Sequence, residues 1–156
     1  MTYYLNLGSN LGNPRLNLTR AMKAVGDEFG PYELSHAVES KPQGFDSTRM
    51  FMNIGLTFES ELDPEEVLSR LQAIEKHISP ASHRRADGSY ADRMIDIDII
   101  AVDELTFDTH HLHVPHPRMA SRLFVLEPMA ELAPAWRHPR TGLTCAEMIA
   151  SLTDNR

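Results

Sequence analysis

Two aspartates separated by a single residue lie in a strongly alternating stretch of the chain. Residues 94–100 read Met-Ile-Asp-Ile-Asp-Ile-Ile, a period-two pattern that predicts a β-strand with isoleucines on one face. Asp96 and Asp98 then project together from the opposite face. Two adjacent carboxylates repel each other unless a cation lies between them, and their hard oxygen atoms suit Mg²⁺. Because Mg²⁺ bound this way usually completes its coordination with phosphate oxygens, the pair predicts a metal–phosphate site.

Positive charge lies close to this pair in the sequence. Arg93 directly precedes the alternating stretch, and Arg84 and Arg85 lie a few residues upstream. Guanidinium groups form strong, often bidentate hydrogen bonds to phosphate oxygens. A bare Asp-x-Asp pattern is as often a solvent-facing pair on an edge strand, and two loop arginines are ordinarily solvated. Their combination favours the metal–phosphate interpretation.

The elements that position these residues follow from periodicity and caps. Besides 94–100, alternation or extended character predicts strands over residues 3–7, 32–39 and 51–59. A capping residue followed by proline predicts helix starts at Asn13-Pro14 and Asp63-Pro64. A helix interrupted by Pro128 is expected over residues 119–132, and Thr144 is expected to cap a short final helix.

This element order, βαββαβ, predicts an α+β fold. We expect a ferredoxin-like core, an antiparallel sheet with helices packed on one face, plus a C-terminal addition. In the strand at 51–59, alternation separates an aliphatic set from Phe51 and Asn53. If the helices cover the aliphatic faces, Phe51, Asn53 and the two aspartates line one site on the other face.

Composition limits the class of protein. The 156 residues are 42% hydrophobic and 24% charged, which fits one globular domain spanning residues 1–156. A net charge of −7 argues against broad binding to nucleic acid or anionic membranes. Cys145 is the only cysteine, so an intramolecular disulfide is excluded and a reducing compartment is favoured. Without an apparent signal peptide or membrane span, we expect a cytoplasmic monomer.

Several ordered segments resemble one enzyme family. They are Gly8-Ser9-Asn10-Leu11, the stretch from Arg93 to Ile99, Val114-Pro115-His116-Pro117-Arg118-Met119, and Arg122-Leu123-Phe124. Together, from Tyr3 to about Pro134, the chain resembles the 6-hydroxymethyl-7,8-dihydropterin pyrophosphokinases. These folate-pathway enzymes transfer pyrophosphate from ATP to a pterin alcohol, so the resemblance implies the same ferredoxin-like fold, reaction and small-molecule substrates.

The resemblance also implies roles for individual residues. It makes Asp96 and Asp98 the ligands of two Mg²⁺ ions bridging the ATP phosphates. It implies a pterin site made of Ser40, Gln43, Phe51, Asn53, Asp96 and Phe124, in which the two phenylalanines sandwich the ring and the asparagine reads its edge. It implies ATP contacts from Gln72, Glu75, Arg93, His116 and Arg122. The implied catalytic set is Arg84, Arg85, Arg93, Asp96 and Asp98, with Arg84 or Arg85 on a loop that closes over the phosphates.

The residues taken singly leave other interpretations open. Phe51 and Phe124 could be core residues, and Gln72 and Glu75 could form the solvent side of a surface helix. The histidines between residues 110 and 116 invite a zinc interpretation, but no third ligand follows at a familiar interval. Two other functional classes also fit in part: another Mg²⁺-dependent phosphoryl or nucleotidyl transferase, which needs no aromatic sandwich, and a non-catalytic ferredoxin-like ligand-binding module, which needs neither the aspartates nor the arginines.

Overall fold

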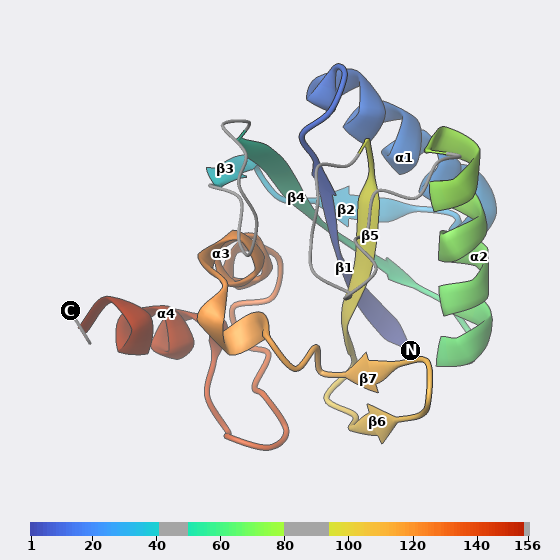
Figure 1. Cartoon of the computed structure of the whole chain (residues 1–156). Helices are drawn as coiled ribbons and strands as arrows, with labels where there is room; N and C mark the ends of the chain where they lie inside the picture. The colour runs from blue at the N-terminus through green and yellow to red at the C-terminus, as the bar shows by residue number, and fades with distance from the viewer. Residues whose placement is uncertain (41–49, 80–93, 155–156) are drawn as a thin grey trace.

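A computed structural model describes residues 1–40, 50–79 and 94–154, and its centre is one antiparallel sheet of five strands (Figure 1). The strand order is β2-β4-β1-β5, with β3 also paired to β4. The three long strands are β1 (Thr2–Ser9), β4 (Phe51–Glu59) and β5 (Asp96–Val102). This order, with both core helices on one face, is that of the predicted ferredoxin-like α+β fold.

Both core helices begin where the capping signals predict. In α1 (Pro14–Phe29), the Asn13 side chain accepts a hydrogen bond from the Leu16 amide at 3.1 Å. In α2 (Pro64–Ile78), Asp63 accepts one from the Glu66 amide at 3.0 Å. Each cap satisfies a backbone donor that the first helical turn leaves without a partner. Figure 1 shows the two helices together on one side of the sheet.

The aliphatic faces of the long strands form the main core beneath these helices. Leu5 and Leu7 of β1, Leu56 of β4 and Ile97 of β5 are buried in one hydrophobic cluster with the inward residues of α1 and α2. These strand residues sit at alternating positions, so the intervening side chains belong to the opposite face. Burial of the aliphatic face therefore determines which side chains remain for a site.

The C-terminal part packs on that opposite face. It contains a short 3-10 helix η1 (Met119–Ser121), α3 (Leu123–Leu132) and α4 (Cys145–Asp154). A second hydrophobic cluster joins Ile100 and Ala101 of β5 to Met129, Trp136 and Met148. Figure 1 shows α3 and α4 on the side of the sheet away from α1 and α2. The C-terminal addition thus covers part of the second face and has a core of its own.

Two segments differ from the predicted elements. The predicted strand at 32–39 is divided into β2 (Tyr32–Leu34) and β3 (Val38–Ser40). The Ser35 amide still donates to the Gly55 carbonyl at 3.0 Å, but the Ser35 hydroxyl accepts from the Gly55 amide at 2.8 Å, a donor that a regular ladder offers to a backbone carbonyl. The predicted helix at 119–132 is interrupted at Arg122, which has extended backbone angles, and not at Pro128, which lies inside α3.

The remaining elements are small. β6 (Phe107–Asp108) and β7 (His113–Val114) form a separate two-stranded ladder. Thr144 caps α4 as predicted, since its hydroxyl accepts from the Glu147 amide at 3.2 Å while Glu147 accepts from the Thr144 amide at 3.0 Å. None of the helices in the described ranges has the length and apolar character that a bilayer span requires.

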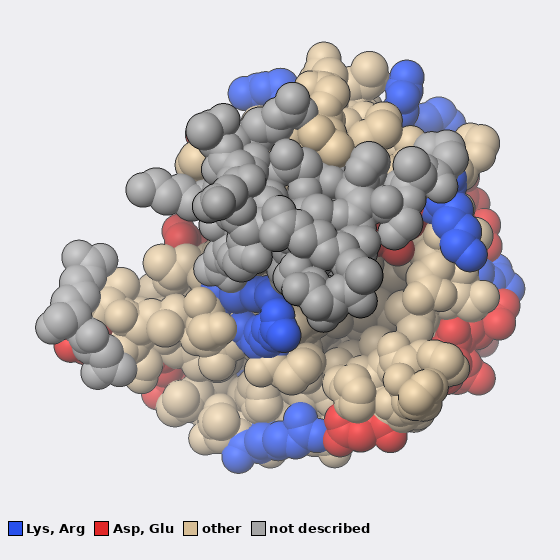
Figure 2. Space-filling model, viewed as in Figure 1, with Lys and Arg blue, Asp and Glu red and all other residues tan. Residues whose placement is uncertain are grey.

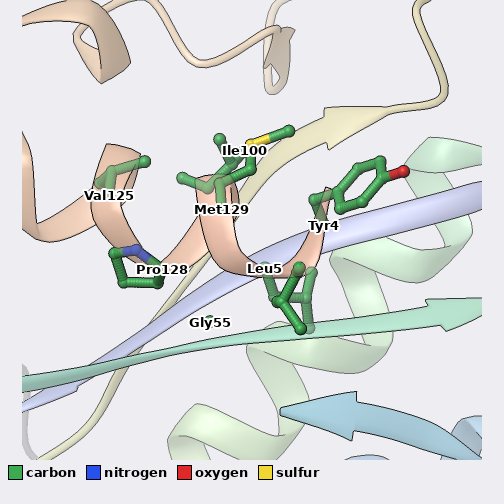
Figure 3. Close-up of a pocket in the computed structure, with 8 residues that line it drawn as sticks. Tyr4, Leu5, Gly55, Ile100, Val125, Pro128 and Met129 are labelled. Atoms are coloured by element: carbon green, nitrogen blue, oxygen red, sulfur yellow. The ribbon is translucent and has the colours of Figure 1, made fainter. Parts of the chain in front are cut away.

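Gly55 sets how closely α3 approaches the sheet. A Cβ atom at this position would lie 2.9 Å from the Pro128 Cβ and 3.1 Å from a Leu132 methyl group. Figure 3 shows Gly55 beneath Pro128 at the edge of a small cavity between α3 and the sheet. The absence of a side chain therefore permits the contact.

We expect Gly55→Val to lower the free energy of unfolding by about 1–3 kcal/mol, the range typical of overpacked cores. Urea denaturation measures this change directly. Glu59→Val in the same strand is the control, because Glu59 is exposed and its substitution should change stability by less than about 0.5 kcal/mol. Equal stability of Gly55→Val and the native protein would contradict the proposed close contact.

Candidate active site

The strand register aligns an amide, a glycine and an aspartate across the sheet. β1 pairs with β4 and β5 so that Gly8 lies between Asn53 and Asp96. A Cβ at Gly8 would lie 2.6 Å from the Asn53 Oδ1 and 3.7 Å from a Phe51 ring carbon. The Asn53 amide nitrogen donates to the Ser40 hydroxyl at 3.1 Å. The glycine thus leaves room for the carboxamide and the ring, and Ser40 fixes the orientation of the carboxamide.

The aspartate pair lies at the start of β5. Asp96 and Asp98 are half-buried and face away from the buried Ile97 between them. The Ile97 amide donates to the Glu75 carboxylate of α2 at 2.8 Å, so this carboxylate occupies the outer edge of β5. Both aspartates share the sheet face of Asn53, as the alternation predicts.

The donor set suits Mg²⁺. In the described part of the chain, no group of three His, Cys, Asp or Glu residues is arranged to hold a metal ion on its own. Asp96 and Asp98 together offer two carboxylates, and Mg²⁺ is commonly held by one or two carboxylates together with waters and substrate phosphates. A pair of aspartates on a partly open face meets that requirement.

A basic and aromatic group lies beside β5, downstream of the aspartates. The His116 amide donates to the Ile100 carbonyl at 2.8 Å, which ties this segment to the strand. Arg122 is 3% exposed, and its guanidinium carbon lies 5.6 Å from the centre of the Phe124 ring. This distance is that of a cation–π contact. Figure 2 shows Lys and Arg side chains gathered on this face, over the segment leading into α3.

His116 is held in its neutral form. Its burial, followed by the nearby charges of Arg122 and Arg118, lowers the pKa of His116 to about 4. The Arg118 amide lies 3.1 Å from the His116 Nδ1, which therefore acts as the acceptor. The neutral ring consequently carries its proton on Nε2 and offers a hydrogen-bond donor without adding charge.

This pKa predicts a pH-dependent stability. Between pH 6.5 and about 4 the unfolded chain protonates this histidine while the folded chain does not, so unfolding is favoured as pH falls through that range. Above pH 6.5 both states are neutral and the effect vanishes. We expect the free energy of unfolding to fall by on the order of 2 kcal/mol over this range. Urea denaturation at a series of pH values between 4 and 8 measures the fall, and His116→Gln should abolish it. Identical pH profiles for the variant and the native protein would refute the assignment.

Further residues position the site although they carry no predicted role. Asn17 of α1 donates to the Ser9 hydroxyl at 3.2 Å and to the Leu11 carbonyl at 2.8 Å, which holds the turn after β1. Asn6 is a buried polar residue in β1, and with Gly8 it forms the centre of the site face. A polar residue within an otherwise apolar alternating strand is the signal that could have indicated Asn6.

The predicted site residues are only partly brought together. Asp96, Asp98, Phe51, Asn53 and Ser40 lie on or beside one sheet face, and His116, Arg122 and Phe124 belong to the adjoining segment. Gln72 is exposed on α2, one helical turn before Glu75. Four predicted residues lie outside the described ranges: Gln43, Arg84, Arg85 and Arg93.

The alternative metal and thiol interpretations gain no support. His113 contacts Asp108 at 3.1 Å and the His110 and His111 rings stack edge to face, without a three-ligand metal group in the described residues. Burial raises the pKa of the Cys145 thiol to about 11, so it stays protonated at neutral pH and packs in the second hydrophobic cluster.

The fold places the chain in the class of ferredoxin-like α+β proteins, with two aspartates, an asparagine and a phenylalanine on one sheet face. The model of the 7,8-dihydro-6-hydroxymethylpterin-pyrophosphokinase family matches residues 4–134. The chain therefore belongs to this family, which confirms the family predicted from the residues.

Individual relatives agree. The chain is 38% identical over 138 residues to a 2-amino-4-hydroxy-6-hydroxymethyldihydropteridine pyrophosphokinase of Porphyromonas gingivalis, covering 87% of this chain and 92% of that protein. It is 32% identical over 138 residues to the protein of that name from Aquifex aeolicus, covering 88% and 84%. A crystal structure of HPPK-DHPS in complex with substrates has a similar fold, with a TM-score of 0.71 at 12% identity. The superposition covers 98% of this chain and 45% of the HPPK-DHPS chain.

Proposed function

We infer that this chain transfers a pyrophosphoryl group from ATP to the hydroxymethyl group of 6-hydroxymethyl-7,8-dihydropterin in folate biosynthesis, with AMP as the second product. The observation that carries the inference is the family match over residues 4–134, together with curated relatives named for this pyrophosphokinase activity. The reaction forms a bond between the pterin oxygen and the β-phosphorus and breaks the bond from that phosphorus to the AMP oxygen. The hydroxyl proton is released.

We propose that Asp96 and Asp98 hold two Mg²⁺ ions. Their position on one face, separated only by the buried Ile97, supports this role. Bound Mg²⁺ would supply charge neutralisation for the phosphate oxygens, which is the main demand of phosphoryl transfer on a protein. The aspartates themselves fix the position of this charge relative to the sheet face that carries Asn53.

We propose that the pterin ring binds between Phe51 and Phe124. Phe51 lies at the start of β4 on the site face, and Phe124 lies in the first turn of α3, which packs on the same side. The Asn53 carboxamide, fixed by Ser40 at 3.1 Å, presents both a donor and an acceptor to a heterocyclic edge. Such an edge pattern favours a pterin over a ring with a different donor and acceptor order.

We propose that the nucleotide lies along the other side of the aspartates. His116 as a neutral donor and Arg122 as a buried cation suit phosphate and nucleotide contacts, and Gln72 and Glu75 of α2 retain their predicted nucleotide roles. The predicted phosphate contacts of Arg84, Arg85 and Arg93, and a pterin contact from Gln43, complete the proposal and lie outside the described residues. We also propose a cytoplasmic monomer, because every assigned residue comes from one chain and ATP is a cytoplasmic substrate.

Isothermal titration calorimetry tests the proposal. The pterin is titrated into the protein alone, into the protein with Mg²⁺, and into the protein with Mg²⁺ and a non-hydrolysable ATP analogue. Mg²⁺ and the analogue are each titrated in separate runs. We expect strong pterin binding only in the last mixture, because the nucleotide completes the site. Light scattering on the same samples measures the oligomeric state.

The outcomes separate the classes considered. Nucleotide binding without pterin binding would favour another Mg²⁺-dependent transferase, and binding of neither nucleotide nor Mg²⁺ would favour a non-catalytic module. Chromatography of a reaction containing ATP and the pterin measures AMP directly. AMP formation that requires the pterin supports the pyrophosphokinase activity.

A further inference from the structure

One carbonyl near the start of α3 cannot form its regular helical hydrogen bond. In an α-helix the carbonyl of residue i accepts from the amide of residue i+4. For Phe124 the residue at i+4 is Pro128, which has no amide hydrogen. The residue that carries this carbonyl is the one proposed to stack on the pterin.

Asn6 supplies the missing donor from the sheet. Its side-chain nitrogen donates to the Phe124 carbonyl at 2.9 Å, across 118 positions of sequence. Asn6 is 5% exposed, so this bond lies in a region where an unpaired carbonyl is costly. Asn6 lies between Leu5 and Leu7 in β1, and this hydrogen bond explains why a buried asparagine occurs there.

The same position connects the helix to both halves of the site. Asn6 pairs with Gly55 on β4 and with Asp98 on β5. Gly55 in turn admits Pro128, whose Cβ would lie 2.9 Å from a Cβ added there, and Figure 3 shows Pro128 lying above it. Pro128 and Gly55 therefore bring α3 close to the sheet, and the hydrogen bond from Asn6 adds a polar contact at the same place.

We propose that Asn6 is a positioning residue for the pterin site: by donating to the carbonyl that Pro128 leaves without a helical donor, it fixes the first turn of α3 and with it the Phe124 ring. This inference rests on the pterin-stacking role in the proposed function. It assigns Asn6 to the pterin and not to the nucleotide, because the bond reaches the backbone of the stacking residue itself.

Three variants test this: Asn6→Ala, Pro128→Ala and the double variant. Asn6→Ala leaves the Phe124 carbonyl without a donor, and we expect it to weaken pterin binding about tenfold, the effect of one buried hydrogen bond. Pro128→Ala alone restores the helical donor and keeps a Cβ against Gly55, so its pterin affinity should stay within about twofold of native. The pterin affinity of the double variant should lie within about threefold of the native value, because the backbone amide that Pro128→Ala restores then donates to the Phe124 carbonyl within the helix.

Pterin fluorescence is titrated with Mg²⁺ and a non-hydrolysable ATP analogue present, and nucleotide affinity is measured separately. The expected pattern is a pterin Kd raised about tenfold in Asn6→Ala, a nucleotide Kd unchanged within about twofold, and rescue of the pterin Kd in the double variant. Equal weakening of both ligands, or a double variant as weak as Asn6→Ala, would overturn the proposal. If Asn6→Ala fails to fold, the double variant is compared with Pro128→Ala: equal pterin affinities support the proposal and a tenfold difference overturns it.

Hydrogen exchange separates this inference from the proposed function. In the ligand-free proteins, the amides of the first turns of α3 should exchange faster in Asn6→Ala alone and recover in the double variant. If the native protein binds no pterin and forms no AMP, the proposed function has failed; the exchange pattern then still decides whether Asn6 fixes this turn. Unchanged exchange in Asn6→Ala would overturn the positioning role whatever the ligand.

Discussion

Replacing Asp96 or Asp98 with alanine will lower the rate of AMP formation about a hundredfold to a thousandfold or more, the effect typical of removing a group that stabilises transition-state charge. Either substitution removes one of the two carboxylates proposed to hold the ions that would neutralise the phosphate charge. Both side chains are half-buried on the site face and lie outside the main hydrophobic core, so the fold should remain intact. Coupled assay of AMP and circular dichroism of the same samples measure the two effects.

A matched control is available on α1. Asp27 is exposed and pairs with Lys23 at 3.0 Å, so Asp27→Ala removes a carboxylate of the same type at a surface ion pair. Such pairs contribute at most about 1 kcal/mol, and turnover should be unchanged. Calorimetric titration of Mg²⁺ in the presence of the ATP analogue gives a second readout, in which the aspartate variants should bind the metal more weakly. Near-native AMP production by both aspartate variants would contradict the metal site.

The second large effect concerns the pterin. Phe51→Ala should weaken pterin binding by about tenfold or more, because one face of the ring loses offset stacking and apolar burial. Nucleotide affinity should change little, since the phenyl ring lies beside Gly8 and Asn53. The pterin titration with Mg²⁺ and the ATP analogue measures the first, and titration of the analogue alone measures the second.

Leu34→Ala is the control for this experiment. Leu34 is an exposed apolar residue of β2, which pairs with the opposite half of β4, so its loss removes apolar surface without touching the site. We expect native affinities for both ligands in this variant. If Phe51→Ala weakens the pterin and the nucleotide by the same factor, the phenyl ring is part of the structural core and the pterin assignment is wrong.

The sequence by itself determined the features that depend on neighbouring residues. Alternation around Asp96 and Asp98 predicted their common face because a strand places every second side chain on one side. The starts of α1 and α2 followed from Asn13 and Asp63, since a cap acts on amides two or three residues away. The ordered motifs predicted the family, and the family match over residues 4–134 confirms it.

Local patterns did not determine where segments break. Ser35 divides the predicted strand at 32–39 because its hydroxyl bonds to Gly55 on another strand, a partner twenty positions away. The helix predicted over residues 119–132 breaks at Arg122, and Pro128 remains inside α3. Proline is tolerated there because Asn6 of β1 satisfies the carbonyl that the helix cannot.

Tertiary structure alone decided how the two halves of the site meet. The register of β1 between β4 and β5 places Gly8 between Asn53 and Asp96, three residues that lie far apart in the sequence. The low pKa of His116 arises chiefly from its burial in the folded chain, to which the charges of the sequence neighbours Arg122 and Arg118 add. Caps and alternation depend on contacts within a few residues, whereas register, burial and desolvation depend on contacts between distant segments, so only the folded chain fixes them.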